Sequence, residues 1–165
     1  MQYKGQQMSD AFNPEDHCPF PHRGFEQLLQ AEKFILPSRT VTDAHFSAFQ
    51  MLSGDNHPIH YDRVYCENQG HRDLLAHGLQ VLCFTAAGAG AFPHIVGESL
   101  IGFIELTVKF KGGVYVNDTL YPSLQITELK PQKTTGVVVM RATVHNQAGE
   151  LVLDGQHKYL LRLSS

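Results

Sequence analysis

The sequence has few charged side chains and no excess of basic ones. Only 18% of its 165 residues are Asp, Glu, Lys or Arg, and 13 basic residues stand against 16 acidic ones. Nucleic-acid binders normally carry a basic surface that pairs with phosphates, so the net charge of −3 argues against a nucleic-acid partner. The 42% of hydrophobic residues, with ten Phe and six Tyr, is instead typical of a folded domain with a sizeable core.

Long hydrophobic runs and an even set of cysteines are also absent. The longest apolar stretch, residues 78–92, is shorter than the roughly 20 residues that a membrane-spanning helix needs. Residues 1–10 are polar and lack the apolar centre of a signal peptide. The three cysteines, Cys18, Cys66 and Cys83, lie far apart, which favours free thiols. We therefore expect no membrane association and a cytoplasmic location.

The first 24 residues differ from the rest of the chain. They are rich in Gln, Asp, His and Pro and show no hydrophobic periodicity. Residues 1–24 are therefore interpreted as an N-terminal arm, partly disordered, in front of one domain over residues 25–165. His17, Cys18 and His22 lie in the arm without the regular four-ligand spacing of a metal site, so no metal site is predicted there.

The hydrophobic pattern of the domain changes from helical to alternating. Residues 42–53 indicate a helix, with a capping threonine before it and a glycine after it. Residues 79–92 are apolar on every side, which predicts a helix buried all round, with Cys83 inert inside it and Pro93 at its end. Strands are predicted at residues 32–41, 100–110 (half-buried), 120–129, 137–146 and 151–163. An antiparallel sheet that curls around one apolar helix predicts an α+β protein with the hot-dog fold.

Two short segments carry the residues suited to chemistry. Residues 53–62, SGDNHPIHYD, place Asp55 and His60 in a loop after the first helix. A carboxylate and an imidazole held close together can share a water molecule and move its protons. Seventeen residues after His60, His77 and Gly78 precede the apolar helix, where the free N–H of Gly78 can hold a carbonyl oxygen that gains negative charge. A carboxylate and an imidazole that activate water, together with an N–H that holds the carbonyl oxygen, suit the addition of water to a conjugated C=C bond, or the reverse reaction.

The same residues resemble a known family. Residues 53–62 are similar to the S-G-D-x-N-P-[LIV]-H-x-D motif of the MaoC-like dehydratases and R-specific enoyl-CoA hydratases. The later His-Gly pair, the V-N-D-T-L segment at 116–120 and the N-Q-A-G-E hairpin at 146–150 are similar to further motifs of that family. Together these matches cover residues 38–163.

The resemblance implies specific roles for the site residues. Asp55 and His60 would form the catalytic pair that binds the water, and the N–H of Gly78 would hold the thioester carbonyl. The family also implies an acyl-CoA substrate, with no metal and no cofactor apart from the CoA of the substrate. A homodimer or a dimer of dimers is implied, with the active site near the interface and the acyl chain along the central helix.

Two positions depart from the family pattern. His57 stands where the motif has Asn, and it either shapes the loop through a ring nitrogen or adds a third titratable group. Ala86 stands where some members carry a Ser, which leaves Thr85 beside it as the candidate hydroxyl. His77 is interpreted as ordering the loop by hydrogen bonding. His57, His77 and Thr85 are placed with Gly78 in the substrate-binding part of the site.

The sequence thus predicts an enzyme, a hydro-lyase that reversibly hydrates a trans-2-enoyl-CoA to the (R)-3-hydroxyacyl-CoA. Three alternatives stay open at this point. The substrate could be a branched or dicarboxylic enoyl-CoA of the mesaconyl-CoA type, the reaction could be thioester hydrolysis, or the chain could be an acyl-thioester binding module without turnover.

Overall fold

A computed structural model describes residues 12–14 and 17–164. Most of the predicted arm, residues 1–11 and 15–16, lies outside these described residues. The end of the arm is tied to the domain, because Arg23 donates its backbone N–H to Ile95 and pairs with Glu32 at 2.5 Å. Within the described part of the chain, no helix is long and apolar enough to cross a membrane.

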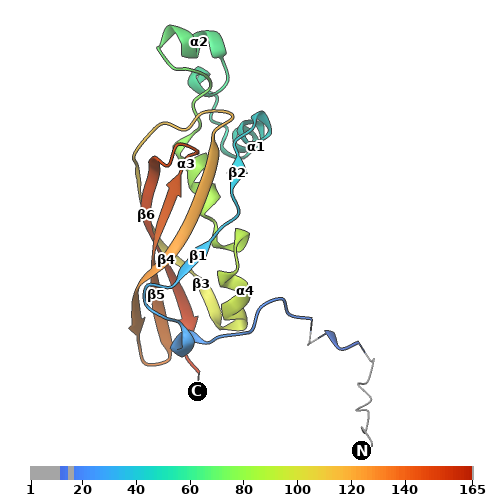
Figure 1. The fold of residues 1–165 in the computed structure, drawn as a ribbon, viewed down its shortest axis with the longest axis vertical. Helices are drawn as coiled ribbons and strands as arrows, with labels where there is room; N and C mark the ends of the chain where they lie inside the picture. The colour runs from blue at the N-terminus through green and yellow to red at the C-terminus, as the bar shows by residue number, and fades with distance from the viewer. Residues whose placement is uncertain (1–11, 15–16, 165) are drawn as a thin grey trace, which may run out of the picture.

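An antiparallel sheet forms most of the molecule (Figure 1). Its strand order is β1-β4-β5-β6-β3, and β2 pairs with β4. The strands are β1 (Lys33–Ile35), β2 (Arg39–Thr40), β3 (Leu100–Phe110), β4 (Thr119–Pro131), β5 (Thr135–His145) and β6 (Leu151–Arg162). The predicted strands and the antiparallel sheet of the α+β class are therefore confirmed.

Short helices accompany the sheet. The α-helices are α1 (Asp43–Ser53), α2 (Arg63–Asn68), α3 (Gly78–Leu82) and α4 (Phe92–Val96). Single 3₁₀ turns are η2 (Phe25–Gln27), η3 (Pro58–His60), η4 (Cys83–Thr85), η5 (Ala87–Ala89) and η6 (Gly97–Ser99). Figure 1 shows α3 and α4 along the sheet, with α1 and α2 at one end of it. The first predicted helix is confirmed, because Thr42 caps α1 and Gly54 ends it in the left-handed conformation with φ 71°.

The predicted central helix over residues 79–92 is wrong as one continuous element. The chain leaves the helical conformation at Ala86, where φ is −55° and ψ is 118°, and continues as separate turns. Pro93 does not close the segment but lies in the first turn of α4, where its missing N–H costs no hydrogen bond. This central segment, residues 79–92, is not buried all round either, since Leu79 is 61% exposed and Cys83 is exposed. All three cysteines are free, as predicted.

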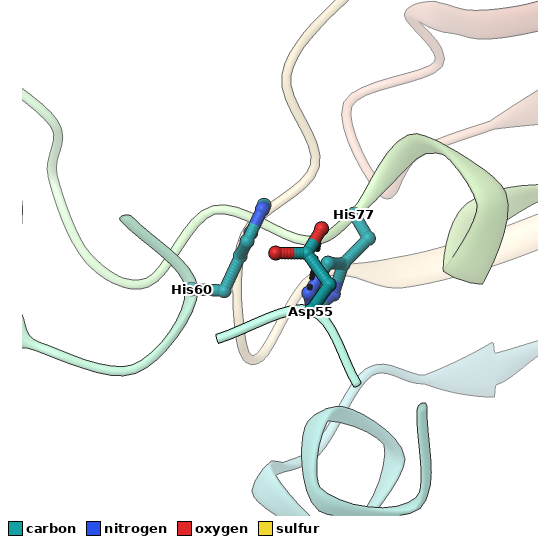
Figure 2. A group of neighbouring side chains, drawn as sticks. All are labelled: Asp55, His60 and His77. Carbon is teal, nitrogen blue, oxygen red and sulfur yellow. Dashed lines mark ion pairs between the residues drawn. The ribbon is translucent and has the colours of Figure 1, made fainter. Parts of the chain in front are cut away.

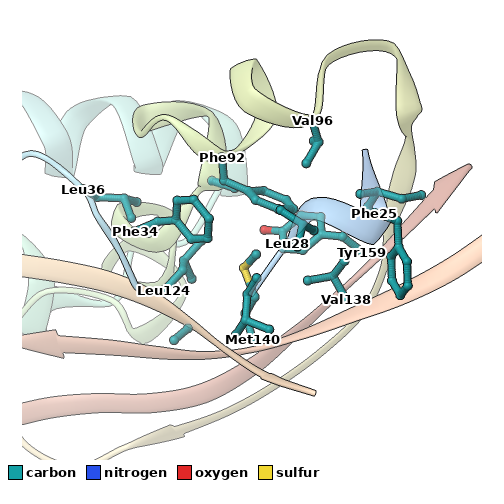
Figure 3. Close-up of a cluster of buried hydrophobic side chains, with 14 residues drawn as sticks. Phe25, Leu28, Phe34, Leu36, Phe92, Val96, Leu124, Val138, Met140 and Tyr159 are labelled. Carbon is teal, nitrogen blue, oxygen red and sulfur yellow. The ribbon is translucent and has the colours of Figure 1, made fainter. Parts of the chain in front are cut away.

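The core lies between the sheet and the central segment, and it has two parts. In the first part, Phe92 of α4 packs on Phe34 of β1 and on Tyr159 of β6, with ring centroids 5.3 and 5.2 Å apart (Figure 3). The second part lies beside the start of α3 and includes Val41, Phe46, Leu74, Val81, Phe84, Leu120 and Leu153. This second cluster fixes α1 and α3 against the sheet and so positions the site described below.

Strand β3 is more exposed than the alternating pattern predicts. Ile101, Phe103, Ile104 and Phe110 are each about half exposed, although the strand reads as half-buried from sequence. β3 ends the strand order and pairs with β6. The alternation identified the strand correctly but not the fraction of its apolar surface that the single chain covers.

Candidate active site

The loop between α1 and α2 holds Asp55 in place through backbone hydrogen bonds. Its own N–H donates to Ser53 Oγ at 3.2 Å, and its Oδ1 accepts the N–H of His57 at 3.1 Å. The other carboxylate oxygen, Oδ2, is thereby left to face the neighbouring histidines. His57 caps the η3 turn, because its Nδ1 accepts the N–H of Ile59 at 3.3 Å. His57 thus shapes the loop through a ring nitrogen in this structure.

His60, at the end of η3, presents an unprotonated nitrogen. Its Nδ1 lies 2.5 Å from the carbonyl oxygen of Leu75, so Nδ1 carries the proton and donates it. Nε2 of the neutral ring is then a free acceptor. Burial lowers the pKa of His60 below its ordinary value of 6.5, although the bond to Leu75 opposes this shift. The neutral ring is therefore the form present near pH 7.

His77 comes from the start of α3 and stacks on His60. The two ring centroids are 3.6 Å apart and the planes differ by 24°. His77 is 4% exposed, its Nδ1 lies 3.0 Å from Gln80 Oε1, and its Nε2 lies 3.2 Å from the hydroxyl of Tyr61. Sequence reasoning gave His77 a loop-ordering role and missed its contact with His60. The sequence signal for the fixed orientation of His77 was Gln80, three residues further on, which is the spacing of a capping box at the start of a helix.

Asp55, His60 and His77 form one cluster, and their potential ligand atoms lie within 4.8 Å of one another (Figure 2). Asp55 Oδ2 is 3.8 Å from His77 Nε2, and the Asp55 side chain is 49% exposed. Stacked rings direct their in-plane lone pairs side by side rather than toward one point, which is a poor arrangement for binding a single metal ion. The arrangement suits a water molecule between a carboxylate and an imidazole better.

Gly78 follows His77 as the first residue of α3, so its N–H has no acceptor within the helix. A Cβ at this position would lie 2.8 Å from the ring of Phe110. Only glycine therefore leaves both the ring of Phe110 and the backbone where they are.

The structure does not bring Thr85 to this cluster. Its hydroxyl donates to the carbonyl of Leu82 at 2.7 Å and lies 3.2 Å from His157 Nε2. The cause is the break in the central segment at Ala86, which leaves the Leu82 carbonyl for the threonine side chain. Thr85 lines a different feature, an apolar cavity of about 280 Å³ between the central segment and strands β3 and β6.

Sequence reasoning missed two buried polar residues beside this cavity. His157 and Tyr159 of β6 are hydrogen-bonded, with 3.0 Å between His157 Nδ1 and the Tyr159 hydroxyl. Burial lowers the pKa of His157 to about 4 and raises the pKa of Tyr159 to about 12, so both are neutral near pH 7. The alternation of β6 marks both positions as inward-facing but does not indicate that their polar atoms bind each other.

A family model described as the MaoC like domain matches residues 27–148. The chain belongs to this family. An (R)-specific enoyl-CoA hydratase from Rhodospirillum rubrum is 27% identical to this MaoC-like chain over 132 residues, 80% of this chain and 87% of that one. The monoamine oxidase regulatory protein from Archaeoglobus fulgius has a TM-score of 0.79 at 28% identity, covering 88% of this chain and 97% of that one.

The fold comparison agrees with the topology. A Mycobacterium tuberculosis protein described as having a double hot-dog fold matches with a TM-score of 0.72 at 24% identity, covering 87% of this chain and 45% of that one. The hot-dog fold and the MaoC-like family predicted from sequence are thereby confirmed.

Proposed function

We propose that this MaoC-like chain reversibly adds water to a trans-2-enoyl-CoA and forms the (R)-3-hydroxyacyl-CoA. One observation carries the proposal: Asp55, His60 and His77 lie in one cluster, and Gly78 follows His77 directly as the first residue of α3. The R. rubrum relative, an (R)-specific enoyl-CoA hydratase, supports the same reaction. The reaction needs no metal and no cofactor beyond the CoA of the substrate.

In the proposed step, the water oxygen bonds to C3 of the enoyl thioester. Nε2 of His60 accepts one proton of the water, and Asp55 accepts a hydrogen bond from the other. The electron pair of the C=C bond moves to the thioester oxygen, which the N–H of Gly78 binds as it gains negative charge. The His60 imidazolium then returns its proton to C2, so the elements of one water molecule are added across the double bond.

The apolar cavity favours a hydrocarbon acyl chain over a dicarboxylic one. Its lining includes Leu82, Ala86, Phe103 and Leu106, and it begins one helical turn beyond Gly78. The polar atoms of Thr85, His157 and Tyr159 bind one another or the backbone. A second carboxylate in this cavity would lose its hydration without gaining a partner. We propose straight-chain 2-enoyl-CoA thioesters as substrates and a homodimer as the active form.

A spectrophotometric panel tests the proposal. Purified chain is mixed with crotonyl-CoA, longer straight-chain 2-enoyl-CoAs and mesaconyl-CoA, and the loss of enoyl absorbance is followed together with the stereochemistry of the product. We expect the (R)-3-hydroxyacyl-CoA from straight-chain substrates and little turnover of mesaconyl-CoA. Release of free thiol, detected with Ellman's reagent, would instead indicate a thioesterase. Calorimetric binding without turnover would indicate a non-catalytic module.

A further inference from the structure

The ring of His77 is held more firmly than a loop-ordering role requires. Three neighbours fix it: Gln80 at Nδ1, Tyr61 at Nε2, and the ring of Phe49, whose centroid is 4.6 Å away. The fourth contact is the stacked ring of His60. A side chain held by these hydrogen bonds and ring contacts has a defined plane, and that plane faces the proposed catalytic base.

Gln80 is the unusual member of this group. It is 3% exposed, and its Oε1 accepts from both the backbone N–H and Nδ1 of His77. Its Nε2 is the one buried side-chain nitrogen or oxygen without a hydrogen-bond partner among the described residues. A buried donor without an acceptor is unfavourable for folding. An apolar side chain of the same length would avoid this cost, so the benefit of glutamine lies in the acceptor it offers to His77.

The bond to Gln80 also places a proton on Nδ1 of His77, because Gln80 Oε1 is an acceptor. Nε2 lies 3.2 Å from the hydroxyl of Tyr61, which also lies 3.5 Å from the carbonyl oxygen of Phe46. When the hydroxyl donates to Nε2, both ring nitrogens of neutral His77 have a partner. A positive charge on His77 would oppose the protonation of His60, which lies directly against it.

His60 needs such a neighbour. The ring of His60 turns about its Cβ–Cγ bond, and the hydrogen bond from Nδ1 to Leu75 restrains one edge of the ring. The stacked ring of His77 on one face restrains this rotation further. A base held in the reactive orientation reacts faster than one that samples several orientations.

We propose that Gln80 and His77 are positioning residues, which hold the His60 ring in plane by stacking a neutral, fixed imidazole against it, an inference that rests on the proposed function. Gln80 keeps the proton of His77 on Nδ1, His77 covers one face of His60, and Leu75 orients the edge of His60. Neither positioning residue takes or gives a proton in the proposed reaction.

The first test compares Gln80→Met with Gln30→Met, a matched control at an exposed glutamine that binds Thr127. We expect Gln80→Met to lower kcat by about tenfold or more with KM unchanged. Gln80→Met removes the unpartnered amide but also leaves the backbone N–H and Nδ1 of His77 without their acceptor, so its thermal midpoint should fall. Rates are therefore compared well below both midpoints, where each variant is folded by circular dichroism. Gln30→Met should keep the wild-type kcat. An unchanged kcat in folded Gln80→Met, or a fall in kcat that disappears when the folded fraction is corrected for, would overturn the positioning role.

A second pair of variants tests the stacking. His77→Phe keeps an aromatic face against His60, whereas His77→Ala removes it. We expect His77→Phe to retain a higher kcat than His77→Ala, with both chains folded by circular dichroism. Equal kcat values for the two folded variants would overturn the role of the ring face.

A measurement without substrate separates this inference from the proposed function. Nuclear magnetic resonance that correlates the ring carbons and nitrogens of histidine identifies the tautomer of each ring. We expect His60 and His77 both to carry the proton on Nδ1 in the wild type, and His77 to lose this preference in Gln80→Met. A proton on Nε2 of His77 in the wild type would overturn the inference. Correct tautomers in a chain that turns over no enoyl-CoA would overturn the proposed function alone.

Discussion

At the scale of single residues, two side chains carry the proposed proton transfers. Asp55→Asn removes the negative charge that orients the water, and His60→Gln removes the nitrogen that accepts its proton. General acid–base groups are worth about 10²–10⁴-fold in rate, so we expect each variant to lose about that factor in kcat/KM for crotonyl-CoA. Initial rates by absorbance measure the loss, and circular dichroism checks the fold.

Matched variants away from the cluster control for the substitutions themselves. Asp43→Asn changes an exposed carboxylate at the start of α1, and His94→Gln changes a histidine of α4 that stacks on Phe20. We expect both to keep the wild-type rate. If either Asp55→Asn or His60→Gln also kept the wild-type rate, the assignment of the catalytic pair would be wrong.

The pH dependence of the rate depends on His60. The proposed base must be unprotonated, and burial lowers its pKa below 6.5. Activity should therefore be full at pH 7 and fall only as the pH drops through that lowered pKa. A profile of kcat/KM against pH for the free enzyme reports this limb. An acidic limb centred above 6.5 would show that a different group acts as the base or that His60 is not desolvated in solution.

At the scale of elements, the hydrogen-bonded set of Tyr159, His157 and Thr85 connects β6 to the end of α3. Thr85 donates to the Leu82 carbonyl, so it accepts from Nε2 of His157, and Nδ1 of His157 accepts from Tyr159. This order requires neutral His157. The set replaces the helical hydrogen bond that the break at Ala86 removes.

A pH-dependent stability follows from this arrangement. The pKa of His157 falls from 6.5 in the unfolded chain to about 4 in the folded one. The unfolded chain therefore binds more protons between these values, and stability falls as the pH drops from about 6.5 toward 4, by up to about 3 kcal/mol. Urea unfolding at several pH values measures the slope. We expect His157→Gln to flatten it, and an equally steep slope in this variant would assign the effect to other groups.

The elements differ in how well the sequence predicts them. Helix α1 was predicted to within one residue because its threonine cap and terminal glycine are local signals. The break at Ala86 was not predicted, because an apolar run rich in alanine and glycine fits a continuous helix by its hydrophobic pattern alone. A local pattern likewise identifies β3 as a strand but does not say what covers its apolar side chains.

In the candidate site, too, local motifs predicted some features and tertiary packing decided the others. The motif placed Asp55, His60 and Gly78 near one another because they belong to two short segments with recognisable spacing, and the structure brings these segments together. It did not indicate the stacking of His77 on His60, because that contact depends on how α3 packs against the loop. Thr85 was placed beside the catalytic pair by its position along a continuous helix; the segment breaks at Ala86, and Thr85 lines the apolar cavity instead.

At the scale of the whole molecule, the uncovered apolar side chains of β3 favour a second copy of the chain. Ile101, Phe103, Ile104 and Phe110 are about half exposed on the last strand of the order. Contiguous apolar surface of this kind marks interaction sites. A symmetric pair would bury the same patch on both copies, and a stable interface covers about 800 Å² on each partner.

We expect light scattering coupled to gel filtration to give twice the 18.4 kDa mass of the single chain. Ile101→Lys combined with Ile104→Lys places two charges in the proposed interface, where their desolvation opposes association, so this variant should elute as a monomer. Val64→Lys, at an apolar residue of α2 that is 66% exposed, is the control and should keep the mass of the wild type. Because Phe110 of β3 lies against Gly78, loss of the pair should also lower the hydratase rate. A monomeric wild type with full turnover would show that the single chain completes its own site and that β3 serves another partner.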